Sequence, residues 1–461
     1  MSGATMTLAN CARVLGAALH AKNIGTTFAG VSTDSRSIAA DELFVALKGP
    51  TFDGHEFLEQ VRQRGAAAAL VSRLMPTDLA QIIVGDTILA YGALAQYWRS
   101  RFTLPIIALT GSNGKTTVKE MLRSVMAKHV GGADGVLATD GNLNNNIGLP
   151  HMLLRLDCRH RAAVLEMGMN HLFEIDYLTR LAVPDVALVI MAGTAHIGEL
   201  GSRQAIAQAK GEIYAGLRDD GVACININDQ YADYWRCLVG NNRRIVTFGT
   251  APSAEVRGEL TQAGLTLHTA VGTAEVGLQV MGEHNQRNAI AAAAGAFALG
   301  VSLPTIAAGL AEFSGVDGRL RRYVNHNFAT IIDDTYNANP DSMRAAINVL
   351  AKLPGKRLLV LGDMAELGED AAVMHAEIGK EAKMARVDGL FALGELAREY
   401  CSGFGAGAVH MASFDELVAT LKPTLDANTT VLIKGSRFMR MERIVYALVD
   451  SAQIKPAKGV H

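Results

Sequence analysis

The pattern of apolar and polar positions divides the 461-residue chain into three zones. Residues 1–104 carry short apolar runs between helical and turn-rich stretches, which predicts a small α/β domain: "ELFVALKG", "AAAALVS" and "QIIVG". From 105 to 315, strands and helices alternate, and the strands are continuous apolar runs: "IIALT", "AAVLEMG", "DVALVIM", "GVACINI" and "RIVTFG". Such runs are typical of a parallel sheet that is buried on both faces. We therefore expect a central domain built on a parallel sheet.

The alternation changes twice after the last of these runs. Residues 255–282, "EVRGELTQAGLTLHTAVGTAEVGLQVMG", alternate polar and apolar positions between glycine turns, which predicts antiparallel hairpins. From 316 to 461, apolar runs are again followed by helical stretches: "ATIIDDTY", "KRLLVLGDM", "DGLFALG" and "TTVLIKGS". This pattern predicts a second doubly wound, Rossmann-like unit. The expected fold class is α/β with three domains, 1–104, 105–315 and 316–461.

The start of the central zone, "PIIALTGSNGKTTVKEMLRSVM" (105–126), combines a strand, a glycine turn and an amphipathic helix that begins near Lys115. A strand that enters a helix through such a turn directs the free N–H groups of the helix toward an anion. Gly111 and Gly114 allow the backbone to curl around it, Lys115 supplies charge, and the Thr116 hydroxyl can ligate magnesium. The usual P-loop has glycine where this chain has Leu109. We still expect the phosphates of a nucleoside triphosphate here, bound by Gly111, Ser112, Asn113, Gly114, Lys115, Thr116 and Thr117.

Composition and charge narrow the classes of function. A formal net charge of −2 gives no overall positive field for nucleic acid or an anionic membrane, so anions must be held by local sites. Five scattered cysteines without a CxxC pair indicate reduced thiols in the cytoplasm. The Ala-rich run 288–301 is too short for a membrane span, and "VLGAALHA" (14–21) is expected to be an ordinary buried helix. We expect a cytoplasmic monomer without membrane insertion.

Motifs along the whole chain resemble those of the Mur ligase superfamily. "TGSNGKTT" is the form that the phosphate loop takes in that family, and "STDSR" (32–36) and "ALKGPTFDGHEF" (46–57) are similar to its UDP-binding segments. The remaining matches lie in the central and C-terminal zones: "GNLNNNIGLP" (141–150), "LEMGMN" (165–170), "AHIGELGS" (195–202), "AKGEIY" (209–214), "GEHNQRNAIAAAA" (282–294), "GRLRR" (318–322), "DDTYNANPDS" (333–342), "LGDMAELG" (361–368) and "IKGSR" (433–437). The resemblance implies a UDP-substrate domain, an ATP-binding central domain and a Rossmann-like C-terminal domain.

The resemblance also implies a reaction. Mur ligases transfer the γ-phosphoryl group of ATP to a carboxylate, and an amine then attacks the acyl phosphate. Two anions meet in the first step, so the site needs positive charge and metal. Several motifs are most similar to the member that adds D-alanyl-D-alanine to UDP-N-acetylmuramoyl-tripeptide, which makes ATP, two Mg²⁺ ions, this tripeptide and the dipeptide the expected ligands.

Two alternatives remain open. The first is the member that adds the preceding, third residue, although the "DNPR" signature of its diaminopimelate-adding form is absent from the sequence. The second belongs to a different class, a P-loop switch or binding protein that uses ATP without forming an amide. That alternative leaves the motifs of the first and third zones unexplained.

Four residues are candidates for the metal site. Glu166 ends the strand "AAVLEMG", and a carboxylate at this edge of a sheet is well placed for magnesium, although a surface or capping glutamate is the alternative. Thr116 is its candidate partner on the loop. The resemblance implies that His196 ligates a second magnesium and that Lys210 is carbamylated into a metal ligand. By composition alone, His196 would be a structural histidine and Lys210 a solvated lysine.

Residues of the later motifs are assigned by resemblance. Asn288 is expected on the adenine side of ATP, and Arg319 and Asp334 match phosphate and ribose contacts from the C-terminal domain. Asn285 and Asn288 open an Ala-rich helix, where asparagine is also a natural cap. Asn337 and Asn339 are expected to shape the loop near the reacting groups, with ordinary turn residues as the alternative.

The UDP-linked substrate is expected to contact both the first and the central zone. Arg36 is suited to offset diphosphate charge, and glycines permit close approach of the backbone. A surface turn with the same residue types is the alternative. The candidates are Ser35, Arg36, Gly49, Asp53, Gly54 and His55 in the first zone, and Asn142 and Asn145 after the central glycine.

Overall fold

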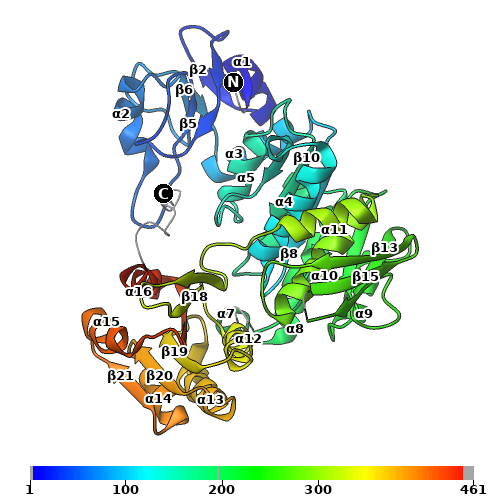
Figure 1. Ribbon diagram of the computed structural model, residues 1–461. Coiled ribbons are helices and arrows are strands. Elements are labelled where there is room, and N and C mark those ends of the chain that lie inside the picture. The colour runs from blue at the N-terminus through cyan, green and yellow to red at the C-terminus, as the bar shows by residue number, and fades with distance from the viewer. Residues whose placement is uncertain (1–3, 195–196, 263, 450–461) are drawn as a thin grey trace.

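The structure, a computed structural model, describes residues 4–194, 197–262 and 264–449. Three lobes follow one another along the chain (Figure 1). The N-terminal lobe, blue, and the C-terminal lobe, yellow to red, both lie on the same side of the central lobe, cyan to green. The expected α/β class with parallel sheets is confirmed, and each lobe contains one main sheet.

The N-terminal lobe contains a five-stranded sheet in the order β2-β7-β6-β5-β4. Strands β4 to β7 are parallel, and β2 runs antiparallel to β7 at the edge. Their bounds are Ala18–His20 (β2), Val31–Ser32 (β4), Leu43–Val45 (β5), Ala68–Val71 (β6) and Gln81–Ile83 (β7). The small antiparallel pair β1 (Thr5–Thr7) and β3 (Thr27–Ala29) and the helices α1 (Leu8–Leu15) and α2 (Leu58–Gln63) complete the lobe.

The expected helix over "VLGAALHA" is wrong. Helix α1 ends at Leu15, and Gly16 adopts a left-handed conformation with φ of 60° that turns the chain into β2. Glycine reaches this conformation without steric cost, so it ends the helix where the apolar pattern alone suggests continuation.

Helix α3 (Thr87–Arg99) joins the N-terminal lobe to the central one. Asp86 caps it, with Oδ1 accepting from the N–H groups of Ile88 and Leu89. At its other end, Trp98 Nε1 donates to the Leu156 carbonyl and Arg99 Nε to the Ala182 carbonyl, both in the central lobe. One apolar core therefore continues from the N-terminal sheet through α3 into the central lobe.

The central lobe contains nine strands in the order β16-β15-β14-β13-β12-β11-β8-β10-β9. The seven strands from β9 to β14 are parallel, and β14, β15 and β16 are antiparallel, as the alternating segment predicts. The bounds are Ile106–Thr110 (β8), Val136–Ala138 (β9), Ala162–Glu166 (β10), Val186–Val189 (β11), Val222–Asn226 (β12), Arg244–Gly249 (β13), Val256–Leu260 (β14), Gly264–Thr269 (β15) and Gly272–Gly277 (β16).

Helices cover both faces of this sheet. On β8, Ile106 and Ala108 pack into one apolar core and Ile107 and Leu109 into the other. One face carries α4 (Lys115–Val130), α10 (Glu283–Ala298) and α11 (Leu303–Glu312). The other carries α3, α5 (Gly148–Leu154), α6 (Glu174–Ala182), α8 (Arg203–Gly211), the 3₁₀ segment Glu212–Gly216 and α9 (Ala232–Val239). Burial on both faces explains why its strands are continuous apolar runs.

The C-terminal lobe has six strands in the order β17-β18-β22-β19-β20-β21, parallel except for the β17–β18 pair. The bounds are Arg321–Val324 (β17), Thr330–Asp334 (β18), Lys356–Gly362 (β19), Gly389–Leu393 (β20), Ala408–Met411 (β21) and Thr429–Lys434 (β22). Its helices are α12 (Pro340–Ala351), α13 (Ala371–Met384), α14 (Arg398–Phe404), α15 (Phe414–Leu421) and α16 (Glu442–Leu448).

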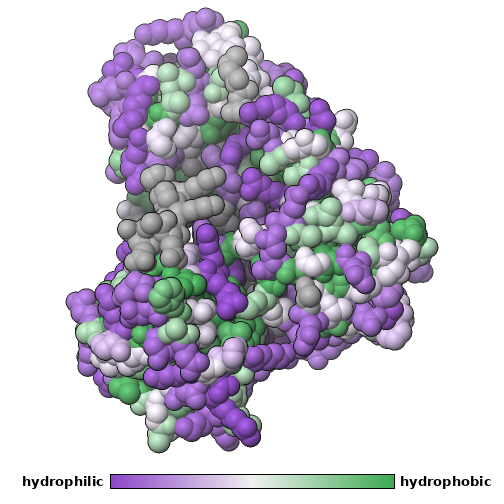
Figure 2. Space-filling model, in the orientation of Figure 1, coloured by the Kyte–Doolittle hydropathy of each residue, from purple (hydrophilic) through white to green (hydrophobic). Residues whose placement is uncertain are grey.

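The surface and the helix lengths describe the outside of the molecule. On the face shown in Figure 2, apolar residues of the described chain form small scattered patches among hydrophilic ones. None of the helices within the described ranges has the length and apolar character that a membrane crossing requires.

Candidate active site

The glycine turn lies between β8 and α4, as the sequence predicts. Gly114 has a φ of +82°, and a Cβ there would lie 2.4 Å from Asn288 Oδ1, so both conformation and space require glycine. Lys115 begins α4, and its Nζ donates to the Gly111 carbonyl at 2.9 Å. Burial lowers the pKa of Lys115, while the nearby Glu166 carboxylate opposes that shift. The turn thus presents a cation and free helix N–H groups at one point.

Glu166 lies directly beside this turn because its strand, β10, pairs with β8 and sets Glu166 opposite Leu109. The side chain is buried, with Asn144 Nδ2 donating to Oε1 at 2.8 Å. Oε2 is buried too and has no hydrogen-bond partner among the described residues. Buried carboxylate oxygens normally have a partner, and an oxygen left open next to a phosphate loop fits a magnesium ligand.

Lys210 lies near the end of α8 and is 1% exposed, so the solvated lysine expected from composition is wrong. Within the described part of the chain, no hydrogen bond or ion pair reaches its Nζ. Burial lowers the pKa of Lys210 well below its usual value, and the charge of Lys115 lowers it further. The environment therefore favours a neutral amine close to the loop. His196, the other candidate ligand, lies outside the described residues.

Two residues of the C-terminal lobe reach the phosphate loop. Arg319 Nη2 donates to Thr116 Oγ1 at 3.4 Å, and the guanidinium lies 4.3 Å from the centre of the Tyr336 ring. Its Nε is buried and has no hydrogen-bond partner among the described residues. Asn339 Nδ2 donates to Asn113 Oδ1 at 2.8 Å. The C-terminal lobe thus brings one cation, Arg319, and one amide, Asn339, to the loop that carries Lys115.

Asn288 faces Gly114 but does not cap its helix. Helix α10 begins at Glu283 with Gly282 in the cap position, so the capping alternative for Asn285 and Asn288 is wrong. Instead, Asn285 Nδ2 donates to the Met281 carbonyl, and Asn288 Nδ2 donates to Asn285 Oδ1.

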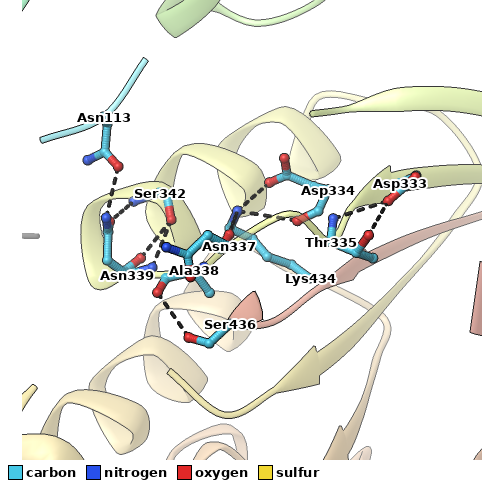
Figure 3. A network of polar contacts seen from close by, with 10 residues as sticks. All are labelled: Asn113, Asp333, Asp334, Thr335, Asn337, Ala338, Asn339, Ser342, Lys434 and Ser436. Carbon is cyan, nitrogen blue, oxygen red and sulfur yellow. Dashed lines mark hydrogen bonds and ion pairs between the residues drawn. The ribbon is translucent and has the colours of Figure 1, made fainter. Parts of the chain in front are cut away.

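Asp334 and Asn337 stay within the C-terminal lobe. Asp334 ends β18, where its Oδ2 accepts from Lys434 Nζ at 2.6 Å. Asn337 Oδ1 accepts from the Ala338 N–H, a local contact that both the expected role near the reacting groups and the ordinary turn residue allow. The network that contains both residues is drawn in Figure 3.

Three family models match consecutive parts of the chain: "Mur ligase family, catalytic domain" over 27–89, "Mur ligase middle domain" over 109–296 and "Mur ligase, glutamate ligase domain" over 318–437. A relative from Escherichia coli K12, named UDP-N-acetylmuramoyl-tripeptide–D-alanyl-D-alanine ligase, is 39% identical over 457 residues, which cover 97% of this chain and 99% of the relative. The chain belongs to the Mur ligase family. The resemblance inferred from the motifs is therefore confirmed.

Further relatives of this Mur ligase carry the same name or fold. The protein so named from Bacillus subtilis is 36% identical and covers 92% of this chain and 94% of its own length. A crystal structure of MurF from Acinetobacter baumannii has a TM-score of 0.91 with 37% identity, covering 97% of this chain and 99% of that one. MurF from Thermotoga maritima in complex with ADP has a TM-score of 0.79 with 26% identity, covering 91% and 96%. The Mur ligase architecture is thus found over nearly the full chain.

In the N-terminal lobe, the expected substrate residues mostly contact one another. His55 is buried, and its Nε2 accepts from the Ser72 N–H at 2.9 Å, which leaves Nδ1 to donate to Asp53 Oδ1 at 2.5 Å. Gly54 is required by packing, since a Cβ there would lie 2.7 Å from the Leu47 carbonyl oxygen. These three residues therefore build the turn after β5, and their contact with the substrate stays a prediction.

Ser35, Arg36 and Gly49 are the other three candidates in this lobe, and a Cβ at Gly49 would lie 2.5 Å from the Phe52 ring. Ser35 is half-buried in a turn and Gly49 is half-buried next to the isolated bridge Lys48–Asp53. The exposed Arg36 forms a bidentate pair with Asp34 at 2.8 and 2.9 Å. Arg36 can therefore meet a diphosphate only by sharing or leaving Asp34.

In the segment "GNLNNNIGLP", the asparagine that contacts the candidate metal site is not one of the two expected substrate residues. Asn142 is exposed, and Asn145 Oδ1 accepts from the N–H groups of Ile147 and Gly148 at the start of α5. The residue that contacts Glu166 is Asn144, which sequence reasoning missed although it lies between the two candidates.

Sequence reasoning also missed the residues that hold the two lobes together. Asp341 Oδ2 accepts from both the N–H and the Oγ1 of Thr194, in the loop after β11. The adjacent Gly193 N–H donates to Ser112 Oγ in the phosphate loop at 2.8 Å. Asp341 belongs to the quoted motif "DDTYNANPDS", so the motif gave a signal, but its partner lies 147 residues away.

Proposed function

We propose that this Mur ligase adds D-alanyl-D-alanine to UDP-N-acetylmuramoyl-tripeptide, with ATP converting the tripeptide carboxylate into an acyl phosphate. The product is the UDP-muramoyl-pentapeptide used in peptidoglycan synthesis. Relatives at 36–39% identity over more than nine-tenths of the chain are named for this reaction, which supports the proposal. We assign substrate binding to residues 1–104, ATP binding to 105–315 and the remaining nucleotide contacts to 316–461.

The observation that carries the chemistry is the carboxylate oxygen of Glu166 that has no hydrogen-bond partner among the described residues and lies beside a loop with two nearby cations. Lys115 comes from the loop itself and Arg319 from the C-terminal lobe. Transfer of a phosphoryl group to a carboxylate brings two anions together, and fixed positive charge lowers the cost of that approach. A site made only to hold a phosphate would not need a buried anion next to it.

Magnesium fits the residues at this site. Glu166 supplies a free anionic oxygen and Thr116 a hydroxyl on the loop, so both would hold the first ion. We assign His196 and Lys210 to a second ion, with Lys210 as a carbamate formed from its amine and carbon dioxide. The lowered pKa of Lys210 supports this assignment because only a neutral amine reacts. Bound magnesium would neutralise phosphate charge and orient the γ-phosphoryl group.

The remaining candidates are assigned by position. The loop residues Gly111 to Thr117, with Asn288, Arg319 and Asp334, would bind ATP, and Asn337 and Asn339 would border the reacting groups. Ser35, Arg36, Gly49, Asp53, Gly54 and His55 would form the UDP side of the substrate site, together with Asn142 and Asn145. The contacts within the Asp53–His55 turn support an indirect role for those three residues, in which they shape the turn that meets the ligand.

We place the reaction in the cytoplasm, in a monomer. All five cysteines are free, which fits a reducing compartment.

One experiment separates the proposed function from its alternatives. The purified protein is incubated with ATP, magnesium, UDP-N-acetylmuramoyl-tripeptide and D-alanyl-D-alanine, and products are identified by mass spectrometry. The expected product is the pentapeptide, formed together with ADP. A parallel incubation with the UDP-muramoyl-dipeptide and single amino acids tests the third-residue-adding enzyme. ADP without any amide in either mixture would identify a P-loop switch and contradict the proposal.

A further inference from the structure

Lys434, the last residue of β22, is buried with 2% of its surface exposed. Its Nζ lies 2.6 Å from Asp334 Oδ2, 2.9 Å from the Asn337 carbonyl and 3.5 Å from the Asp334 carbonyl (Figure 3). An ammonium group has three hydrogens to donate, and here all three are directed at one four-residue turn, 334–337. The ammonium group of Lys434 therefore joins the first and the last residue of that turn.

The position of this contact is fixed by the sheet. Strands β18 and β22 are parallel neighbours, and their register sets Asp334 opposite Lys434. Burial lowers the pKa of Lys434, whereas the Asp334 carboxylate raises it and thereby favours the charged form. Ser436, two residues further, donates from Oγ to the Ala338 carbonyl at 3.3 Å. The end of β22 thus holds the whole chain segment from 334 to 338.

This segment leads directly to the phosphate loop. Asn339 follows it and caps α12, with Oδ1 accepting from the Ser342 N–H at 2.9 Å. Because the cap requires the oxygen there, the amide nitrogen points the other way, to Asn113 Oδ1 at 2.8 Å. Figure 3 shows Asn113 arriving from a separate part of the chain to meet this amide. A continuous series of contacts therefore joins Lys434 to the loop that we assign to ATP.

We propose that Lys434 is a positioning residue for ATP: it fixes the 334–338 turn so that Asn339 holds Asn113 and the C-terminal lobe stays aligned with the phosphate loop. The proposal rests on the proposed function, because the aligned loop is the one that would carry the transferred phosphoryl group. Lys434 itself touches neither the loop nor any residue of the central lobe in the hydrogen bonds of the described chain. Its effect on the position of that loop therefore passes through Asn339, while its ion pair with Asp334, which we also assign to ATP, is left in place by changes at Asn339.

A double-mutant cycle on the full-length enzyme tests this. Lys434→Met removes the ammonium at similar length, and Asn339→Ser keeps a good helix cap but is too short to reach Asn113. The exposed Lys356, at the start of β19 in the same sheet, gives the matched control Lys356→Met. Affinity for a non-hydrolysable ATP analogue is measured by calorimetry, and KM for ATP and kcat by ADP release. Thermal unfolding reports the stability of each variant.

We expect each single variant to weaken analogue binding and raise KM for ATP about tenfold or more, since small misplacements at a phosphoryl-transfer site are costly. In the Lys434→Met background, Asn339→Ser should add less than about twofold, because the contact it removes is already lost. Lys356→Met should match the wild type. If the fold-losses in analogue affinity of the two single variants multiply in the double variant, the proposal is overturned. A lower unfolding temperature of Lys434→Met with unchanged analogue affinity would also overturn it and leave Lys434 a purely structural residue.

A variant that does not fold and a failure of the ligation test can each be told apart from failure of this proposal. If Lys434→Met does not fold, the same cycle is run with Lys434→Gln, which keeps a buried donor but removes the charge. Analogue binding does not depend on amide formation, so failure of the ligation test with an intact cycle would refute the proposed function alone.

Discussion

Replacing Lys210 separates its chemistry from its packing. Truncation to alanine removes three methylene groups from a side chain that is 1% exposed, which costs about 2.4 kcal/mol at about 0.8 kcal/mol per methylene. It also removes an amine whose charged form is desolvated without an ion-pair partner among the described residues, a penalty of several kcal/mol. The two effects oppose each other, so the free energy of unfolding of Lys210→Ala should lie within about 2 kcal/mol of the wild-type value. Lys210→Met fills the space without charge and should be more stable than the wild type by about 1 to 4 kcal/mol.

The same pair of variants tests the carbamate. Both should lose nearly all ligase activity, because neither can supply the carboxylate-like oxygens that we assign to the second magnesium. Acetate or formate should partly restore Lys210→Ala, whose cavity admits a small carboxylate, and should leave Lys210→Met inactive because methionine occupies that cavity. Initial rates of ADP and pentapeptide formation against acid concentration give the measurement, with chloride as the control anion.

The pH dependence of stability provides a second readout. The pKa of Lys210 is lowered in the folded state, so unfolding takes up a proton between that lowered value and the ordinary value of 10.5. The free energy of unfolding of the wild type should therefore rise with pH relative to that of Lys210→Met. The difference between the two should stop changing near pH 10.5. Chemical unfolding in buffers free of carbon dioxide isolates the amine from the carbamate.

Several results would refute this reasoning. Full activity of Lys210→Ala without added acid would remove the metal role. Equal rescue of both variants would show that the acid acts elsewhere. A methionine variant less stable than the wild type at neutral pH would mean that Lys210 is paired in the folded protein.

Three further predictions follow from named contacts. Lys115→Met should lower kcat at least about a hundredfold with little change in unfolding temperature, while Lys128→Met, at the exposed end of the same helix, should keep wild-type kinetics; equal activity of both variants would contradict the phosphate assignment. Asp53→Asn should have a lower unfolding temperature than the wild type at pH 7, because hydrogen bonds from His55 stabilise the Asp53 carboxylate and lower its pKa. The difference between the two unfolding temperatures should shrink as pH falls below 3.8, since protonation of Asp53 removes that stabilisation. A difference that stays constant with pH in calorimetry would argue against this pair. Asp341→Ala should enlarge the ligand-free radius of gyration in small-angle scattering, because it removes both hydrogen bonds to Thr194; an unchanged radius would show that other contacts hold the lobes.

The sequence by itself determined the parts of this protein that depend on neighbouring residues. Apolar periodicity located the main strands of each sheet, and the phosphate loop could be predicted because its glycines, lysine and hydroxyls are contiguous and the strand and helix around them are local structures. Short strands without long apolar runs, such as β9, β17 and β21, gave too little signal.

Only the tertiary structure decided which residues meet across long separations. Lys434 and Asp334 are 100 residues apart, and Asn113 and Asn339 are 226 apart, so these contacts depend on sheet register and on how the lobes pack. Burial also depends on the tertiary structure: it encloses the Lys210 amine, and it leaves Glu166 Oε2 without a partner among the described residues. It also places His55 inside the lobe, where its ring accepts from the Ser72 N–H. A side chain's type is written in the sequence, but its solvation and its partners follow from the packing of distant segments, and these set its chemistry.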